Sequence, residues 1–153
     1  MSIDPDNPVM KLCAAGISAE MAGLRDEASK LYQEAWDAKT NDYEACIASH
    51  YLARLQKTPE ESLHWNAEAL RFAKLAADAG LQEFFPSLYL NLGKSHEDLN
   101  NFTEARRFYS LAERASGVLS DGEYAETVRR GIRRGLERVK SVDTPMNLPQ
   151  TQF

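Results

Sequence analysis

Three histidines and two cysteines are the side chains whose chemistry first suggests a metal or catalytic site. His50, His64 and His96 show neither a His-x-x-x-His nor a His-Glu-x-x-His spacing, and no Cys-x-x-Cys occurs. Those spacings bring two ligands together on one helix face or in one tight turn, as a zinc site requires. The sequence therefore predicts no metal site. It also lacks the Gly-x-x-x-x-Gly-Lys loop that would cradle a phosphate.

An acid–base cluster is suggested by three adjacent residues, His96, Glu97 and Asp98. Adjacent residues on a helix point in different directions, so these three do not form a triad. His96 is better explained as a packed ring between two helices. We therefore expect the protein not to be an enzyme and to require no cofactor.

A second group of polar and aromatic residues lies near the middle of the chain. His50 and Arg54 are one helical turn apart, and Trp65 lies on the helix that follows. Together they could form a small-ligand or enzymatic pocket. The alternative, which we favour, is an exposed polar pair beside a Trp65 side chain that belongs to the core.

Five arginines between residues 129 and 138 form two short rows on one predicted helix. Residues one turn apart lie on the same side of a helix, so the rows could contact phosphates or an acidic partner. The alternative is a solvated outer face, because positive charge near the C-terminal end of a helix is favourable to its dipole. The rows are Arg129 with Arg133, and Arg130 with Arg134 and Arg138.

The composition favours one soluble domain and argues against a protein that coats nucleic acid. The chain has 153 residues, a net charge of −5 and a pI near 5.2. No run approaches the roughly 18 apolar residues of a spanning helix, and the first residues do not resemble a signal peptide. Cys13 and Cys46 lie among small apolar residues, where buried thiols are favoured over a disulfide. We expect a cytoplasmic protein.

Apolar residues recur at three and four positions through most of the chain, the period of amphipathic helices. Asn7-Pro8 and Thr58-Pro59 are typical helix starts, with a capping side chain before a proline in the first turn. No segment has strand periodicity, so an all-α fold is predicted. The expected organisation is a flexible stretch over residues 1–7, helical hairpins over about 8–39, 42–79 and 86–117, a capping helix over 120–140, and a disordered tail over 141–153.

Within these hairpins one residue pattern occurs twice. Ala105, Tyr109 and Ala112 follow one another at the same spacing as Ala28, Tyr32 and Ala35, 77 residues earlier in each case. Gly93 precedes Ala105 by twelve residues, as Gly16 precedes Ala28. With Tyr89, Leu92 and His96 added, the segment resembles the tetratricopeptide repeat family. It departs from that pattern at His96, where an aromatic is usual, and at Gly117, where proline is common. The resemblance covers about residues 8–117.

This resemblance implies a short right-handed superhelix of stacked helical hairpins. Members of the family usually bind a peptide or helix in a concave groove lined by the first helix of each hairpin. Asn91 matches the position where many of them hold an asparagine that contacts the backbone of the peptide, and Lys94 and Asp98 flank it. The carboxylate-clamp variant needs cations where this chain has Cys13 and Ile17, so that variant is not expected.

The function predicted from the sequence is therefore a protein-interaction scaffold or adaptor. The groove candidates are Asn91, Lys94 and Asp98, with His50 and Arg54 on the preceding hairpin. The first alternative is a regulatory adaptor that contacts nucleic acid or an acidic partner through the arginine rows. The second is a small-ligand or enzymatic pocket around His50, Arg54 and Trp65. The exposed ends of a short solenoid would also permit self-association.

Overall fold

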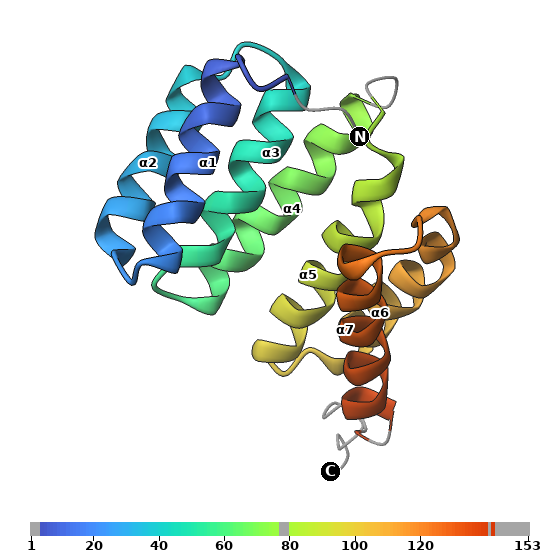
Figure 1. The fold of residues 1–153 in the computed structure, drawn as a ribbon. Coiled ribbons are helices and arrows are strands. Elements are labelled where there is room, and N and C mark those ends of the chain that lie inside the picture. Colours follow the sequence, from blue (N-terminus) through green and yellow to red (C-terminus); the bar gives the residue numbers. More distant parts are fainter. Residues whose placement is uncertain (1–3, 77–79, 141, 143–153) are drawn as a thin grey trace. The chain divides into compact units, whose positions relative to one another are not determined.

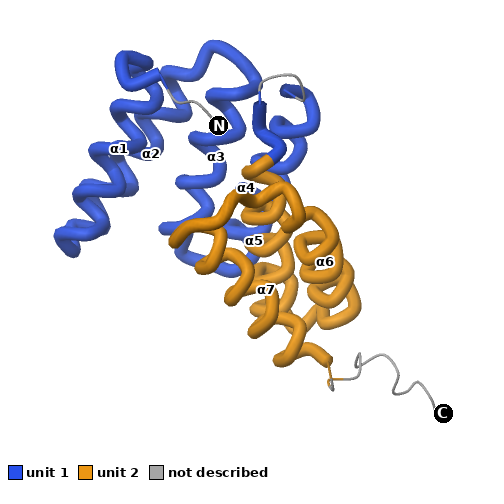
Figure 2. Tube along the Cα trace, turned by 45° about the vertical axis from the view of Figure 1, so that its right-hand side comes forward, with its two compact units in different colours: residues 1–82 blue, residues 83–153 orange. Residues whose placement is uncertain are grey.

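The computed structural model of the protein describes residues 4–76, 80–140 and 142 (Figure 1). These residues form helices, turns and short connections, and no strand is found among them, which confirms the predicted all-α class. The chain separates into two compact units, residues 1–82 and 83–153 (Figure 2). The single domain predicted over residues 8–140 stays a prediction.

Unit 1 consists of two pairs of helices. Asn7 caps the first helix as predicted, since its side-chain oxygen accepts from the amides of Val9 and Met10 at 2.8 and 3.1 Å. Thr58 caps the fourth helix through the amide of Glu61 at 3.1 Å. The first helix packs on the second and the third on the fourth. The elements are α1 (Pro8–Met21), α2 (Arg25–Ala38), α3 (Asp42–Leu52), a 3-10 turn (Ala53–Leu55) and α4 (Pro59–Leu75).

Unit 2 consists of one helical pair and a third helix packed on both of its members. Asn100 has a φ of 60° in the tight turn between the first two helices, a conformation that asparagine tolerates better than most residues. A 3-10 turn (Gln82–Phe84) begins in unit 1 and leads into unit 2. The elements that follow are α5 (Phe85–Asp98), α6 (Phe102–Ala115), a 3-10 turn (Ser116–Val118) and α7 (Glu123–Lys140).

Several predicted boundaries need correction. In the hairpin predicted over 42–79, the first helix is α-helical to Leu52 and then tightens into the 3-10 turn. The capping helix begins at Glu123 instead of 120, because Gly122 at φ 145° lies outside helical geometry. Ser120, which precedes this helix, donates its hydroxyl to Glu83 at 3.1 Å. The second helix of the hairpin predicted over 42–79 ends at Leu75. Residues 1–3, 77–79 and the tail, residue 142 excepted, lie outside the described residues.

A buried cluster of unit 1 lies where α1, α2 and α3 meet, and Trp65 of α4 packs against it. Tyr32 and Ala28 of α2 are fully buried and pack with Leu52 of α3. Cys13 and Cys46 are buried free thiols, and burial raises the pKa of each to about 12. Two members of the predicted apolar faces are instead exposed, because they lie at the turn between α1 and α2. These are Met21 and Leu24.

A buried carboxylate joins the two helical pairs of unit 1. Glu44, near the start of α3, accepts from the side-chain amide of Asn7 at 2.8 Å and from the backbone amide of Thr40 at 2.8 Å. Burial works against the charge on Glu44, but these hydrogen bonds outweigh burial and lower its pKa. The cap of α1 is thereby tied to the first turn of α3.

The core of unit 2 lies between α7 and the pair formed by α5 and α6. Val128 and Ile132 of α7 pack with Ala112 of α6, and Val139 packs with Ala105 and Tyr109. One apolar stripe of α7 is buried and its other residues are mostly exposed, as expected of a helix that caps an open face. The arginines of α7 therefore lie on the sides of the helix that flank the buried stripe.

Candidate functional site

A tyrosine, a glutamate and an arginine from three helices meet at the centre of unit 2. Tyr109 donates its hydroxyl to Glu97 at 2.6 Å, and Arg138 donates to both oxygens of Glu97 at 2.7 and 3.0 Å. The ring of Tyr109 lies between Gly93 and Gly135, where an added Cβ would come within 2.6 and 2.5 Å of the ring. Only glycine allows α5 and α7 to approach the ring this closely.

Unit 1 repeats this centre. Tyr32 donates its hydroxyl to Glu20 at 2.7 Å, and Arg54 donates to both oxygens of that carboxylate at 3.1 and 2.8 Å. Gly16 lies against one face of the ring. The ring of Tyr51 stacks on Tyr32 with centroids 5.3 Å apart, in the place that Gly135 takes in unit 2.

The two centres hold helices together and are poorly suited to proton transfer. The hydrogen bond from Arg54, helped by Tyr32, lowers the pKa of Glu20. Burial opposes the charge on Glu97, but its bonds to Arg138 and Tyr109 outweigh burial and lower that pKa too. Burial and the neighbouring carboxylate raise the pKa of both tyrosines. A general base and acid need pKa values near the working pH, and these pairs are shifted apart.

The predicted pocket around His50, Arg54 and Trp65 has its residues engaged in packing or pairing. Arg54 bonds to Glu20, and the ring of His50 lies edge-on to Tyr51 with centroids 4.9 Å apart. Burial, and then the charge of Arg54, lower the pKa of His50 to about 4. The Trp65 ring packs into the core of unit 1. This agrees with the interpretation of Trp65 as a core residue.

The predicted groove residues of unit 2 lie together on one face of α5. Lys94 and Asp98 are both exposed and form an ion pair one turn apart. Asn91 is half-buried one turn before Lys94. The opposite side of the helix packs inward, since Leu92 and Gly93 are buried.

His96 contacts the core through its ring. It stacks on Phe108 of α6 with centroids 5.4 Å apart and an interplanar angle of 7°. Burial, more than the surrounding charges, lowers the pKa of His96. The structure therefore places this histidine as the packed ring that the sequence pattern indicated.

The arginine rows of α7 are partly used inside unit 2. Arg138 belongs to the centre described above. Arg129 donates to the backbone carbonyls of Ser116 and Leu119 at 3.3 and 3.1 Å, which anchors the turn before α7. These two residues are therefore structural anchors, and neither row is an unbroken basic surface.

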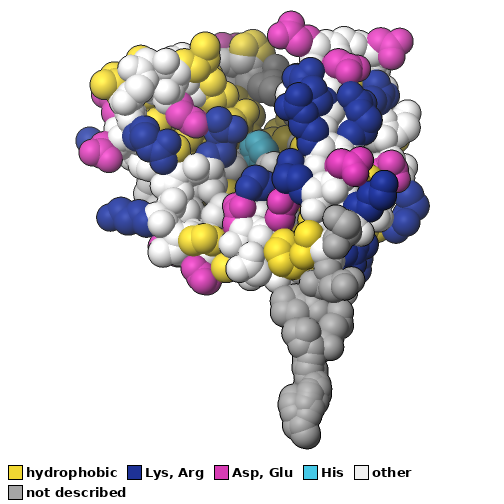
Figure 3. All heavy atoms as spheres, turned by 90° about the horizontal axis from the view of Figure 1, so that it is seen from below, with side chains coloured by type: hydrophobic (Ala, Val, Ile, Leu, Met, Phe, Trp, Pro, Cys, Tyr) yellow, Lys and Arg dark blue, Asp and Glu magenta, His cyan; other side chains and the backbone are white. Residues whose placement is uncertain are grey.

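The remaining three arginines of the rows are exposed. Arg133 lies 3.6 Å from Glu126. Arg130 and Arg134 have no polar partner among the residues that the structure describes. On the face drawn in Figure 3, Lys and Arg side chains are interspersed with Asp and Glu. A continuous phosphate-binding surface would require a more uniform positive charge.

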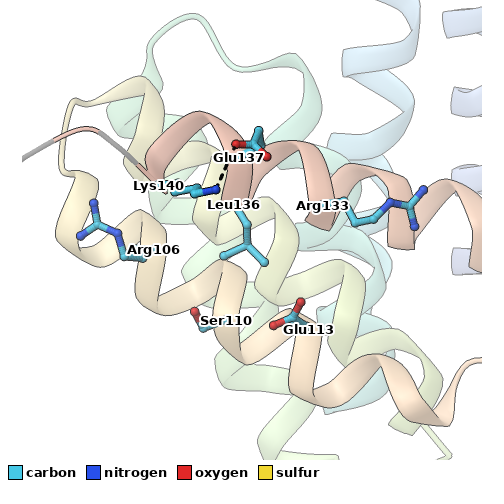
Figure 4. A pocket seen from close by; sticks show the side chains of 7 residues that line it. All are labelled: Arg106, Ser110, Glu113, Arg133, Leu136, Glu137 and Lys140. Atoms are coloured by element: carbon cyan, nitrogen blue, oxygen red, sulfur yellow. Dashed lines mark ion pairs between the residues drawn. The ribbon is translucent and has the colours of Figure 1, made fainter.

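A cleft between α6 and α7 was not predicted. It has a volume of about 510 Å³, and only Arg133 among its residues belongs to the predicted candidates. Figure 4 shows Arg106 and Lys140 toward one end and Arg133 toward the other. Each helix contributes polar residues at positions i, i+4 and i+7, a signal that is visible in the sequence once the two helices are known to be neighbours. The lining residues are Arg106, Ser110, Glu113, Arg133, Leu136, Glu137 and Lys140.

The described part of the chain contains no metal-binding cluster and no membrane-spanning helix. No group of three or more His, Cys, Asp or Glu side chains is placed there to hold a metal ion. None of the described helices combines the length and apolar character needed to cross a membrane.

Comparison of the chain with protein-family models, curated proteins and solved structures gave no match. The resemblance to tetratricopeptide repeats therefore rests on the residue pattern of the chain itself.

Proposed function

We propose that the protein is an interaction module whose helical pairs stack as in tetratricopeptide repeats and which binds a peptide or helix of another protein. The binding groove is lined by the first helix of each pair. In unit 2 its central contacts come from Asn91, Lys94 and Asp98. The molecule acts as a scaffold or adaptor and performs no chemistry on its partner.

The observation that supports this proposal is the division of α5 into two sides. Leu92 and Gly93 pack inward, while Lys94 and Asp98 lie exposed and pair only along the helix surface. An exposed pair of this kind contributes little to stability, so it can be exchanged for contacts with a partner at low cost. The amide of Asn91 can both donate and accept, which suits a peptide group.

The chemistry of the two Tyr–Glu–Arg centres is consistent with a binding role. The centre of unit 2 holds three helices in place, and the centre of unit 1 holds two helices and the 3-10 turn after α3. A rigid framework reduces the entropy lost when a peptide binds to its surface. The strongest polar interactions of each unit therefore serve to position the helices.

The proposal is tested by affinity capture of partners from the source cell. The wild type is compared with the double variant Asn91→Ala, Lys94→Ala and with the control Lys30→Ala, which removes the same charge from an exposed position on α2. We expect partners that are captured by the wild type and the control to be lost from the double variant. Capture that survives in the double variant would contradict the proposal.

The two alternatives have their own readouts in the same preparation. Binding that weakens steeply with salt and is removed by Arg130→Ala, Arg134→Ala would favour an adaptor that acts through α7. A small molecule retained in native mass spectrometry and lost on His50→Ala would favour a ligand pocket in unit 1. Either result would replace the groove proposal.

A further inference from the structure

In unit 1 the groove between α2 and α3 is filled by α4. The ring of Trp65 meets Trp36 of α2 edge-on with centroids 5.0 Å apart, and Phe72 meets the same ring at 5.8 Å. Ser62 donates its hydroxyl to the carbonyl of Ala53, at the end of α3, at 2.9 Å. One face of α4 thus contacts both helices.

The cleft between α6 and α7 is the counterpart of that groove in unit 2. α6 corresponds to α2 with an offset of 77 residues, the spacing between Tyr32 and Tyr109. α7 corresponds to α3 together with the 3-10 turn that follows it, with an offset of 84 residues. This is the spacing between Arg54 and Arg138, which bond to equivalent glutamates. The two offsets assign to each cleft residue an equivalent residue on α2 or in the segment from Asp42 to Gln56.

At three equivalent positions of the cleft and of the unit 1 groove, one residue type is the same and two differ. Leu136 matches Leu52, which belongs to the buried cluster that Trp65 packs against in unit 1, so an apolar residue is kept at this position. Glu113 takes the position of Trp36, and Glu137 that of Ala53. The groove of unit 1 is therefore occupied by a helix of the same chain. Its counterpart in unit 2 has an apolar centre and charged edges.

No described helix occupies this cleft. Its volume of about 510 Å³ lies between the two helices, with Leu136 near its middle (Figure 4). Glu113 has no polar partner for its carboxylate among the residues that the structure describes. Arg133 and Lys140 make only long ion pairs, at 3.6 and 3.8 Å, with exposed glutamates. These charges are available to a bound partner.

Two basic residues lie at one end of the cleft, and the other end carries both Glu113 and Arg133 (Figure 4). Arg106 donates to the carbonyls of Val139 and Val142 at 2.7 and 2.8 Å, which places it beside Lys140 at the C-terminal end of α7. Glu113 lies toward the opposite end (Figure 4). A helix that runs antiparallel to α7, as α4 runs against α3, would begin at the basic end and finish near Glu113.

Such a helix has complementary charges when it follows the usual preferences of helix ends. Acidic residues are favoured in the first turn and basic residues in the last. α4 itself has Glu60 and Glu61 in its first turn and Lys74 in its last. A first turn of that kind would meet Arg106 and Lys140, and a last turn of that kind would meet Glu113.

We propose that the cleft between α6 and α7 docks one amphipathic helix of a partner protein, in the place that α4 occupies in unit 1. The helix lies antiparallel to α7 and sets an apolar side chain on Leu136. Its acidic first turn contacts Arg106 and Lys140. This surface is separate from the groove on α5. An experiment can therefore contradict the proposal for one surface and leave the proposal for the other unaffected.

The probe for this proposal is a fluorescein-labelled peptide with the sequence of residues 58–76, capped at both ends. Its binding to the full chain is followed by fluorescence anisotropy. We expect Ser110→Tyr, which fills the cleft without changing the core, to weaken binding by about tenfold or more. Lys140→Glu should weaken it by a smaller factor, while the exposed control Lys30→Glu should leave it unchanged.

A charge exchange makes the test specific for the orientation. A second peptide with lysine in place of Glu60 and Glu61 should bind the wild type weakly and recover affinity with Lys140→Glu. Failure of the first peptide to bind, or equal binding to wild type and Ser110→Tyr, would overturn the proposal. Far-ultraviolet circular dichroism of each variant checks that its helices are intact.

Other occupants of the cleft give distinguishable results. Self-association of the wild type that is abolished by Ser110→Tyr would assign the cleft to a second copy. Tighter peptide binding by about tenfold after removal of residues 143–153 would assign it to the chain's own following segment. Each of these outcomes would overturn the assignment to a partner protein.

Discussion

At the scale of single residues, the three histidines of the chain have different surroundings. His96 stacks on Phe108, and His50 lies edge-on to Tyr51 beside Arg54, while His64 is exposed. Imidazoles that could serve as proton carriers near neutral pH need a pKa close to it. The lowered pKa of His50 and of His96 fits neutral, packed rings.

The partly buried position of His50 predicts a pH dependence of stability. Its pKa is about 4 in the folded protein and about 6.5 when unfolded, so between these values the unfolded chain binds the proton more strongly. Stability should therefore fall as the pH drops from about 6.5 to 4, by about 2 kcal/mol from this residue. Urea unfolding at pH 7 and 4.5 should show a smaller loss for His50→Gln than for the wild type.

The matched control for this experiment is His64→Gln. Because His64 is exposed on α4, this variant should keep the full loss of stability between pH 7 and 4.5. His96, whose pKa is also lowered by burial, contributes in the same direction and stays present in both variants. Equal pH dependence in wild type and His50→Gln would show that His50 is protonated in the fold.

At the scale of helices, a glycine facing a tyrosine sets the distance between the members of a pair. Gly16 faces Tyr32 and Gly93 faces Tyr109. In both pairs the glycine precedes the alanine of the repeated pattern, Ala28 or Ala105, by twelve residues. Both tyrosines are fully buried, and both hydroxyls reach a glutamate of the partner helix. This arrangement explains why the residue pattern occurs twice in the chain.

A methyl group on α5 should therefore be destabilising despite its helix propensity. In Gly93→Ala the new Cβ would lie 2.6 Å from the Tyr109 ring, which is held on its other side by Gly135. Overpacking should cost about 1–3 kcal/mol, more than the gain of about 1 kcal/mol expected for alanine in a helix. Denaturant unfolding followed by circular dichroism measures the difference.

Gly117 provides the control for this substitution. An added Cβ there meets no atom within 4 Å, so Gly117→Ala should be neutral or slightly stabilising. If Gly93→Ala were as stable as Gly117→Ala, this would contradict the close contact between Gly93 and the Tyr109 ring.

At the scale of the whole molecule, the two units have separate core clusters and equivalent polar centres. The resemblance to tetratricopeptide repeats predicts that helical pairs of this kind stack into a superhelix. In a stack of repeats, the stability of one unit depends on the interface with the next. The two tryptophans, Trp36 and Trp65, both lie in unit 1, so tryptophan fluorescence reports the unfolding of that unit.

A continuous superhelix predicts that damage in unit 2 is felt in unit 1. Gly93→Ala should lower the denaturant midpoint of tryptophan fluorescence as well as that of circular dichroism, while Gly117→Ala should change neither midpoint downward. An unchanged fluorescence midpoint in Gly93→Ala would instead describe two domains that unfold independently, and would contradict the predicted single domain over residues 8–140.

The local features of the fold could be predicted from the sequence alone. The all-α class, the caps at Asn7 and Thr58 and the packed role of His96 depend on residues within a few turns of one another. Their spacing along the chain is enough to predict them. The helix ends at Leu52 and Glu123 were less predictable, since 3-10 geometry and the φ of Gly122 depend on how the next element is held.

The tertiary structure decided which polar residues are used within each unit. Arg54 and Arg138 bond to glutamates 34 and 41 residues away, so no helical period reveals the pairing. Because of this pairing, Arg138 does not contribute to a free basic row and Arg54 does not contribute to the predicted pocket. The α6/α7 cleft likewise appears only when two helices lie side by side. Hydrophobic periodicity determines which elements form, but contacts across elements require their packed arrangement.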